Sequence, residues 1–281
     1  MALSTSDFVN VGGSRLIEEL TTVVSRAAAA VLAVRAGVLG LRTKTDLSPV
    51  TAADDAAEAI IMAEVTRLLP GVPIVSEEAV YHVPPEPFEG DFVLVDPVDG
   101  TRELVAGRDE FTVNVAVISG GRPVLGIIAA PARGLIWRTP NAGGAERLRL
   151  VPGAPADAAQ DRTPIRPRSP SGGALIAAVS RSHLDAQSQA LLARLPKVEC
   201  LASGSSVKLC WVAEGTADIY PRLAPTHEWD VAAGDAIVTA AGAMVTTADG
   251  KPLSYGRVAQ GFIVPGFIAW GDPSIAATLA L

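Results

Sequence analysis

The first seventy residues show the apolar spacing of two helices. Residues 14–40 are rich in Ala, Leu and Val with charges at intervals, which predicts one long helix. Thr51 opens a second amphipathic stretch, which ends before Pro70 and Gly71. Thr51 and Asp54 match the S/T-x-x-D/E pattern of a helix N-terminus, so a capping role alone would explain both residues.

The middle of the chain shows the shorter apolar runs that are typical of strands. Residues 92–95 form an apolar run of the kind found in buried strands. Residues 111–118 and 123–129 predict a β-hairpin that turns at Gly120–Gly121. The first half of the chain is therefore expected to contain helices followed by antiparallel strands.

The second half begins after a stretch rich in Pro, Ala, Arg and Gly. This stretch, residues 151–173, predicts a linker or surface loop. Beyond it, strand candidates such as 174–180 alternate with helix candidates such as 229–241, which indicates an α/β arrangement. We therefore divide the chain into an N-terminal α+β domain, residues 1–165, and a C-terminal α/β domain, residues 166–281.

Composition narrows the classes of function that fit this pattern. The hydrophobic content of 49% excludes a disordered chain, and the formal net charge of −7 argues against a nucleic-acid binder, which would need a basic stripe. A small anionic ligand stays compatible, because a few cations or a bound metal reverse the field inside one cleft. The acidic excess therefore raises the question of whether it is spread or gathered at one place.

Signals for export and for membrane insertion are weak. The chain has two cysteines, Cys200 and Cys210, so no framework of disulfides is expected. The N-terminus lacks the basic and apolar regions of a secretory signal, and the apolar stretch 23–41 contains Arg26 and Arg35. We expect a cytoplasmic protein without integral membrane contact, and a peripheral association with the inner face of the cell membrane stays open.

The acidic residues of most interest follow predicted strands. Asp96 and Asp99 come directly after an apolar run, and Gly100 permits a sharp turn with free backbone amides. Two carboxylates at a strand end suit a divalent cation such as Mg²⁺, Mn²⁺ or Ca²⁺. A plain turn at Asp99–Gly100 is the alternative.

Two further acidic segments have simple structural explanations of their own. Glu77–Glu78 follows a short apolar strand, and the alternative is a solvated charged pair. Asp230 precedes a helix rich in small residues, where an ordinary N-cap would account for it.

Taken together, these segments resemble the lithium-sensitive, Mg²⁺-dependent phosphatase superfamily of inositol monophosphatases, fructose bisphosphatases and bisphosphate nucleotidases. Its pattern is an acidic pair after a strand, then D-P-x-D-G-T, and far downstream W-D-x-x-A-G. The chain has Glu77–Glu78, DPVDGT at 96–101 and WDVAAG at 229–234, in that order. The resemblance spans residues 14–270 and implies a layered αβαβα fold, with mixed and antiparallel sheets flanked by helices.

Within that superfamily the chain is most similar to the CysQ-type 3'(2'),5'-bisphosphate nucleotidases. The similarity rests on short segments: SPVTAAD at 48–54, DGTRE at 99–103, EFTVN at 110–114, SRSH at 180–183, GSSVK at 204–208 and AEGTADIYPR at 213–222. Arg102 and Leu104 stand where this branch often has Lys and Phe, which leaves fine substrate preference open.

The resemblance implies a metal site with defined ligands. Two or three Mg²⁺ ions are expected, with Mn²⁺ as a substitute and Li⁺ as an inhibitor. The implied ligands are Glu77, Asp96, Asp99, Asp230 and the backbone carbonyl of Val98, with Glu78 behind them. Asp54 and Thr101 would position and deprotonate the attacking water. Gly100 and Thr101 would offer backbone amides to the phosphate.

The substrate side is expected from the second domain. Ser205, Ser206 and Lys208 lie at a predicted helix start, a favourable place for an anionic group. Lys208 and Arg222 could face a second phosphate, and solvated surface charge is the alternative for both. Thr226 and Glu228 come just before Trp229–Asp230, so they are expected near the sugar or base.

The resemblance therefore implies an enzyme that removes the 3'-phosphate of adenosine 3',5'-bisphosphate, giving AMP and phosphate. It could also act on 3'-phosphoadenylyl sulfate, and its role would lie in sulfate assimilation. The partner would be a small bisphosphorylated nucleotide, and the chain would be a monomer or a homodimer. An inositol-1-phosphatase or a broad sugar phosphatase is the first alternative, and a non-catalytic metal- and nucleotide-binding regulator is the second.

Overall fold

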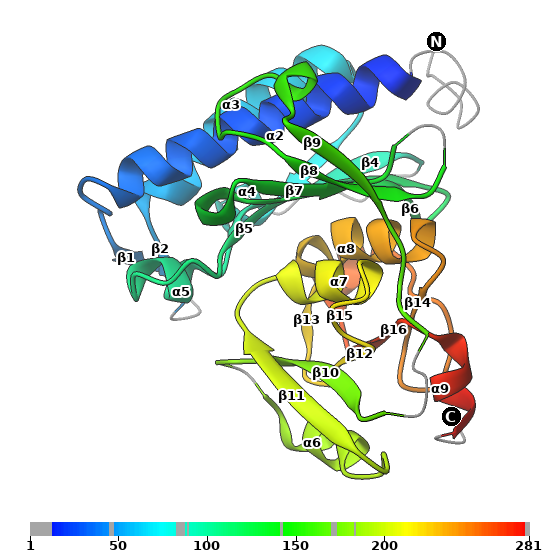
Figure 1. Cartoon of the computed structure of the whole chain (residues 1–281). Helices are drawn as coiled ribbons and strands as arrows, with labels where there is room; N and C mark the ends of the chain where they lie inside the picture. The colour runs from blue at the N-terminus through cyan, green and yellow to red at the C-terminus, as the bar shows by residue number, and fades with distance from the viewer. Residues whose placement is uncertain are drawn as a thin grey trace.

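The computed structural model describes residues 13–44, 48–82, 88, 90–140, 143–169, 173–182 and 184–278. Its α-helices, labelled as in Figure 1, are α2 (Gly13–Arg35), α3 (Ala52–Leu68), α4 (Glu77–His82), α5 (Thr101–Val105), α6 (Ala186–Leu192), α7 (Val207–Ala213), α8 (Glu228–Ala240) and α9 (Pro273–Thr278). Short 3-10 helices are η1 (Pro131–Arg133), η2 (Ala156–Ala158) and η3 (Val258–Gln260).

The strands form two main sheets and two small ribbons. The first sheet has the order β3 (Ile74–Ser76), β4 (Phe92–Asp99), β5 (Thr112–Ser119), β6 (Arg122–Ala130), β7 (Leu135–Arg138), β8 (Ala145–Arg149) and β9 (Asp161–Ile165). The second has the order β11 (Val198–Ser203), β10 (Leu175–Ser180), β12 (Ile219–Arg222), β16 (Phe267–Trp270) and β14 (Met244–Thr246). The ribbons pair β1 (Arg42–Thr43) with β2 (Pro49–Val50), and β13 (Thr226–His227) with β15 (Ile263–Val264).

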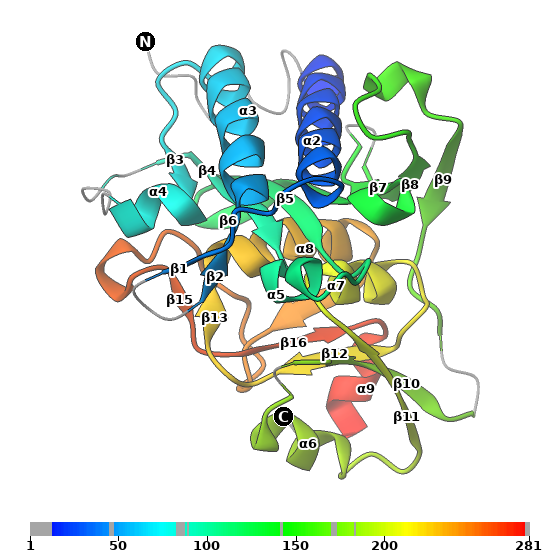
Figure 2. The same ribbon diagram turned by 90° about the vertical axis from the view of Figure 1, so that its left-hand side faces the viewer.

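The elements stack in five layers, which Figures 1 and 2 show from two sides. Helices α2 and α3 cover the outer face of the first sheet, and α7 and α8 fill the space between the two sheets. Helices α6 and α9 cover the far side of the second sheet. The expected αβαβα layering, with a mixed sheet and a largely antiparallel sheet between helices, is confirmed.

The apolar run of β4 is continuous because both of its faces are buried. Val93 and Val95 pack under α2 and α3, whereas Phe92 and Leu94 pack toward α7 and α8. A strand covered on both faces has no need for alternating polar positions. Two places along the same sheet, β6 carries Gly126, where a Cβ would lie 2.2 Å from the Ala233 carbonyl oxygen, so glycine allows α8 to approach the sheet closely.

Several expected boundaries are confirmed and others are corrected. The hairpin turns at Gly120 and Gly121, whose φ values of 56° and 72° match a two-residue turn. Thr51 caps α3 in a capping box with Asp54. The first helix ends at Arg35 and not at residue 40, because Gly37 and then Gly40, with φ of +58°, follow it.

The stretch expected as a linker contains regular structure. Strand β9 (Asp161–Ile165) pairs with β8 and completes the edge of the first sheet. Its composition hid this, because a half-exposed edge strand with a proline lacks a clear apolar pattern. The division into two domains at residue 165 stays a prediction, since α8 from the second half packs on β5 and β6 of the first.

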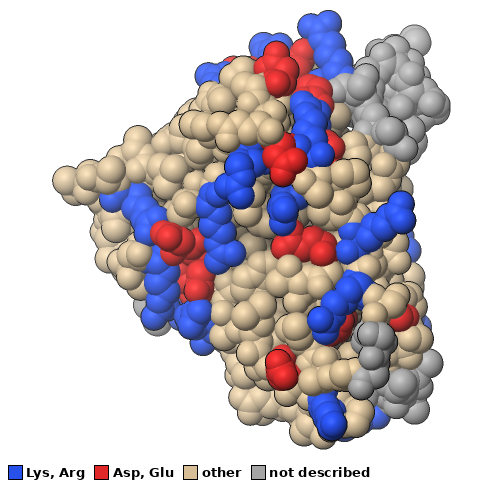
Figure 3. All heavy atoms as spheres, viewed as in Figure 1, with Lys and Arg blue, Asp and Glu red and all other residues tan. Residues whose placement is uncertain are grey.

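Two further observations concern the charged surface and the helices. On the face shown in Figure 3, Lys and Arg side chains alternate with Asp and Glu and form no basic stripe. Within the residues that the structure covers, no helix combines the length and apolar character needed to cross a lipid bilayer.

Candidate active site

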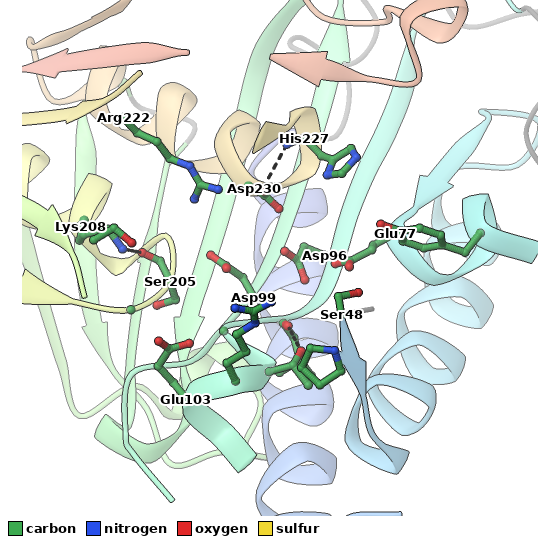
Figure 4. Close-up of a pocket in the computed structure, with 18 residues that line it drawn as sticks. Ser48, Glu77, Asp96, Asp99, Glu103, Ser205, Lys208, Arg222, His227 and Asp230 are labelled. Carbon is green, nitrogen blue, oxygen red and sulfur yellow. Dashed lines mark hydrogen bonds between the residues drawn. The ribbon is translucent and has the colours of Figure 1, made fainter. Parts of the chain in front are cut away.

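One cavity lies where strand ends and helix starts from both halves of the chain meet (Figure 4). The end of β4, the starts of α4, α5 and α8, the loop before α7 and the end of β12 all contribute side chains. The described lining consists of Ser48, Pro49, Glu77, Tyr81, Asp96, Val98, Asp99, Gly100, Thr101, Arg102, Glu103, Ser180, Gly204, Ser205, Lys208, Arg222, His227 and Asp230.

Three carboxylates converge on one side of this cavity. Glu77 begins α4, Asp96 lies within β4, and Asp230 lies in the first turn of α8. One oxygen from each of them lies within 4.8 Å of the others. The expected solvated pair at Glu77–Glu78 is therefore the wrong alternative for Glu77.

Burial and mutual repulsion both act against the charged forms of these acids. Burial, together with the charge of Asp230, raises the pKa of Glu77 to about 8 against the opposing effect of Lys44. Burial, and then the charges of Glu77 and Asp99, raise the pKa of Asp96 well above its ordinary value. A divalent cation would relieve this repulsion.

The donor set fits such a cation. Asp96 Oδ1 is buried and has no hydrogen-bond partner among the described residues. Buried polar atoms are normally satisfied, so an oxygen of this kind inside a carboxylate cluster suits a metal ligand. All three groups are hard oxygen donors, which favour Mg²⁺ or Mn²⁺ over softer metals.

A β-bulge turns both aspartates of β4 toward the cavity. Residues three apart on a regular strand point to opposite faces. The pairing of β4 with β5 shifts by one residue between Asp96 and Asp99, and such a bulge re-aims side chains. The strand therefore runs through Asp99, whereas the apolar pattern predicted its end at Val95.

Asp99 connects the two halves of the cavity. Its Oδ2 accepts a hydrogen bond of 2.5 Å from the backbone amide of Ser206. Burial raises its pKa to about 6, Asp230 adds to the rise, and the charges of Lys208 and Arg222 oppose it. Asp99 thus lies on the cavity wall between the acidic cluster and the basic side chains (Figure 4).

Asp54 forms a hydrogen-bonded pair with Thr101, and of the two only Thr101 belongs to the described cavity lining. Asp54 Oδ2 accepts from the Thr51 amide and hydroxyl, both at 2.8 Å. The Thr101 hydroxyl lies 3.2 Å from Asp54 Oδ1 and 3.0 Å from the Val98 carbonyl oxygen. Burial raises the pKa of Asp54. Capping therefore accounts for only one of its two oxygens.

Two cations line the opposite side, the buried Lys208 and the half-buried Arg222. Lys208 in α7 is only 2% exposed, and its ammonium donates to the Ser205 carbonyl and lies 5.1 Å from the centre of the Tyr220 ring. Burial lowers its pKa to about 8, Asp99 opposes this, and Arg222 adds to it. Surface charge is therefore the wrong alternative for Lys208, and this buried cation beside the half-buried Arg222 favours an anion near both.

Some expected residues contact other residues of the site and are not part of the described cavity lining. The Ser206 hydroxyl donates to the Asn114 amide oxygen at 2.8 Å, and the Thr226 hydroxyl donates to the Asp230 carboxylate. Helix α8 starts at Glu228, with His227 as N-cap and Asp230 in its first turn, so Asp230 is not the N-cap itself. Glu78 lies behind Glu77, 2.6 Å from the ammonium of Lys44.

Like Ser206 and Thr226, Glu228 is an expected substrate residue that is absent from the described lining. Its carboxylate accepts hydrogen bonds of 2.7 Å and 2.9 Å from the amides of Gly256 and Arg257. These bonds turn the side chain toward the loop before η3. Its position in the motif indicated proximity to Asp230, but adjacent residues on a helix point in different directions.

Sequence reasoning missed several residues of the site. Lys44 directly follows β1 and lies 2.7 Å from Glu77, which is 33 residues further along the chain, so no local pattern indicates this contact. Glu103 and Arg102 directly follow the DGT segment, and that adjacency was the available signal. His183, from the SRSH segment, lies outside the described residues.

The fold and the site first define a class. The molecule is a five-layer α/β protein whose single described carboxylate cluster could hold a metal ion in the cavity that Lys208 and Arg222 also line. The family model for the inositol monophosphatase family matches residues 14–275. The chain belongs to the inositol monophosphatase family.

Individual relatives support this membership. The 3'(2'),5'-bisphosphate nucleotidase CysQ of Escherichia coli K12 is 39% identical over 225 residues, covering 80% of this chain and 86% of the relative. The CysQ protein of Salmonella typhimurium LT2 is 35% identical over 262 residues, covering 90% and 98%.

Solved structures show the same fold. CysQ from Bacteroides thetaiotaomicron, described as a bacterial member of the family, has a TM-score of 0.75 and 30% identity, covering 93% of this chain and 98% of that one. An IMPase from Thermotoga maritima has a TM-score of 0.73 at 21% identity, covering 95% of each chain, which is a likeness of fold alone.

Proposed function

We propose that this protein is a Mg²⁺-dependent 3'(2'),5'-bisphosphate nucleotidase that removes the 3'-phosphate of adenosine 3',5'-bisphosphate. The observation that supports this most strongly is that one cavity contains two sites of opposite charge. The cluster of Glu77, Asp96 and Asp230 suits a metal and a reacting phosphate, whereas Lys208 and Arg222 suit a second phosphate. The curated relatives named as CysQ nucleotidases cover most of the chain and agree with this substrate.

The metal would be held by side chains from three elements. Glu77, Asp96, Asp99 and Asp230, with the Val98 carbonyl, are the proposed ligands, and Glu78 stabilises the cluster from behind through Lys44. When bound, Mg²⁺ neutralises the phosphoryl oxygens and lowers the pKa of water. Family membership supports a metal-dependent reaction, and the number of ions, Mn²⁺ substitution and inhibition by Li⁺ are part of the proposal.

Asp54 and Thr101 are the proposed pair that orients and deprotonates the attacking water. The Thr101 hydroxyl donates to the Asp54 carboxylate, so its oxygen can accept a proton from water in turn. The raised pKa of Asp54 suits a group that takes up a proton during the reaction. This arrangement needs no nucleophilic Ser, Cys or His.

The phosphate would be held by backbone and by the second half of the chain. Gly100 has φ of +94°, and a Cβ there would lie 2.8 Å from the Glu110 carbonyl oxygen, so glycine is required for the turn that presents the amides of Gly100 and Thr101. Ser205, Lys208 and Arg222 would hold the second phosphate. Ser206 and Thr226 would position Asp99 and Asp230.

Three finer statements belong to the same proposal. The enzyme would also accept 3'-phosphoadenylyl sulfate, whose 3'-phosphate has the same surroundings. It would clear nucleotide bisphosphate during sulfate assimilation. It would work in the cytoplasm, and the two free thiols of Cys200 and Cys210 support this location. It would be a monomer or a homodimer.

The assay compares phosphate release from adenosine 3',5'-bisphosphate with release from inositol 1-phosphate, each with and without Mg²⁺. We expect Mg²⁺-dependent turnover that strongly favours the nucleotide and is inhibited by Li⁺. An inositol ester that is turned over as fast would favour the inositol phosphatase alternative, which shares the metal site. Nucleotide binding without any turnover would favour a regulator, and turnover without metal would contradict the mechanism.

A further inference from the structure

Glu103 is a carboxylate on the cavity wall that the metal site does not use. It lies in α5, is only 4% exposed and belongs to the cavity lining. In Figure 4 it lies beside Ser205 and Lys208, on the side of Asp99 that is away from Glu77. It is absent from the cluster of converging metal-type oxygens among the described residues. Its role must therefore differ from that of the acidic cluster.

Its partners within the described chain use only part of its capacity. Glu103 Oε1 accepts a hydrogen bond of 2.7 Å from the Ser182 hydroxyl. No Lys or Arg of the described residues forms an ion pair with it, and the nearby Lys208 ammonium donates to the Ser205 carbonyl. A carboxylate can accept about four hydrogen bonds. A carboxylate on a cavity wall with so few partners can therefore still accept hydrogen bonds from a ligand.

The loop before α7 holds this carboxylate in one place. A Cβ at Gly204 would lie 2.6 Å from Glu103 Cγ and 2.7 Å from its Cδ, so the glycine backbone packs directly on the side chain. Ser182 fixes it from the second half of the chain. An acceptor that is held in place before the ligand arrives loses less conformational entropy on binding. Such preorganisation is typical of groups that contact a ligand.

We propose that Glu103 is a specificity-determining residue whose carboxylate accepts a hydrogen bond from the nucleoside part of the substrate. The donor is a neutral O–H or N–H group, either a ribose hydroxyl or the exocyclic amine of adenine. This inference rests on the proposed function. The same negative charge repels a phosphate from this position, so phosphates are directed to Lys208 and Arg222 while the nucleoside donor meets Glu103.

The test combines Glu103→Gln with three substrates: adenosine 3',5'-bisphosphate, its 2'-deoxy analogue and inosine 3',5'-bisphosphate. The glutamine keeps the size of the side chain but loses the charge and presents a donor. We expect kcat/KM for the adenosine substrate to fall about ten- to hundredfold, mainly through KM. We expect a change of less than about twofold for whichever analogue lacks the donor, because that contact is already missing.

The two analogues identify the source of the hydrogen bond. If the ribose hydroxyl is the donor, Glu103→Gln lowers kcat/KM for the adenosine and inosine substrates but not for the 2'-deoxy substrate. If the adenine amine is the donor, the effect disappears with inosine, whose oxygen accepts and does not donate. An equal loss on all three substrates, or no loss on any, would overturn the proposal.

Three controls keep the result interpretable. Glu199→Gln changes an exposed glutamate of β11 and should leave all three values unchanged. Ser182→Ala should shift the same substrates in the same direction by a smaller factor, because it only loosens Glu103. If Glu103→Gln does not fold, the wild-type enzyme alone decides, since equal kcat/KM values for all three nucleotides would overturn the proposal. A wild-type enzyme that hydrolyses inositol 1-phosphate and none of the nucleotides would instead refute the proposed function, and this inference with it.

Discussion

Two buried clusters of charge in this molecule differ in whether the chain supplies both signs. Under α2, Arg138 is 1% exposed and donates to Glu18 at 2.6 Å, Glu146 at 2.7 Å and Thr21 at 2.8 Å. In the cavity, Asp96 and Asp230 form no ion pair with any described Lys or Arg. The first cluster is complete without a ligand, whereas the second has an excess of negative charge.

The pKa directions express the same difference. Hydrogen bonding to Arg162, and then to Arg138, lowers the pKa of Glu18 to about 2, so the charged form is stabilised. Burial raises the pKa of Glu77 to about 8, so its charged form is destabilised. Balanced buried charge therefore supports the fold here, and unbalanced buried charge inside a cavity indicates a site for a cation.

The largest expected effect is on the unbalanced cluster. Asp96→Asn removes a proposed metal ligand while keeping the shape of the side chain. Phosphate release should fall by about a thousandfold or more, because the charge that holds the cation at the phosphoryl group is lost. Without metal at about pH 8 the variant should unfold at the same or a higher temperature than wild type, because it removes one of several repelling charges.

The matched control is Asp157→Asn, which changes an exposed aspartate of η2 and should alter neither quantity. Phosphate release and thermal unfolding, each with Mg²⁺ and with a chelator, separate activity from stability. A variant of Asp96 with near-normal kcat would remove it from the ligand set.

The second expected effect is on the balanced cluster of Arg138, Glu18 and Glu146. Arg138→Met leaves two glutamates without their buried cation, so the free energy of unfolding should fall by about 3 kcal/mol near neutral pH. The pKa of Glu18 is lowered, so the stability from its pairing is present above about pH 4.5 and is lost as the pH falls toward 2. The difference between variant and wild type should therefore shrink in acid.

Urea unfolding at several pH values measures this difference, and phosphate release per folded molecule should stay unchanged. Arg149→Met, on the exposed side of the neighbouring strand β8, is the matched control. If Arg138→Met lowered kcat as strongly as Asp96→Asn while the protein stayed folded, the two clusters would not be separate in function.

The sequence predicted the acidic half of the site better than the rest, for a physical reason. Asp96, Asp99 and Asp230 lie where short apolar or small-residue runs begin or end, and such positions emerge at element ends. The directions of side chains were less predictable. The β4 bulge and the turn of Glu228 toward Gly256 depend on pairing partners far along the chain.

The same limit applied to the fold. The layers followed from periodicity and from the family motifs, but β9 was hidden by its edge position and the first helix was predicted too long. Glu103 was missed because its surroundings come from Ser182 and Gly204, both remote in sequence. Local spacing reports which residues share an element, whereas a site depends on which elements meet.

The smallest expected effect concerns Asp235, a buried acid outside both clusters. It tests whether a raised pKa can arise from burial alone, without a ligand site. Asp235 in α8 is 6% exposed and accepts hydrogen bonds from the Tyr255 hydroxyl at 2.8 Å and the Thr239 hydroxyl at 3.2 Å. Burial raises its pKa to about 6, against the opposing charge of Arg122. Because its folded pKa lies above the unfolded value, ionisation costs stability as the pH rises from about 4 to about 6, and this cost persists above that range.

Asp235→Asn should therefore be more stable than wild type by about 1 kcal/mol near pH 8, with no advantage below about pH 4 and no change in phosphate release. Urea unfolding across this range provides the measurement, and a loss of stability at every pH would mean that the charged carboxylate is needed by Tyr255. Asp235 shares its raised pKa with Glu77, but among the described residues no acid contributes to that rise and Asp235 is not part of the cavity lining. The combination of repulsion between acids and an open cavity therefore indicates a metal site, whereas a raised pKa alone does not.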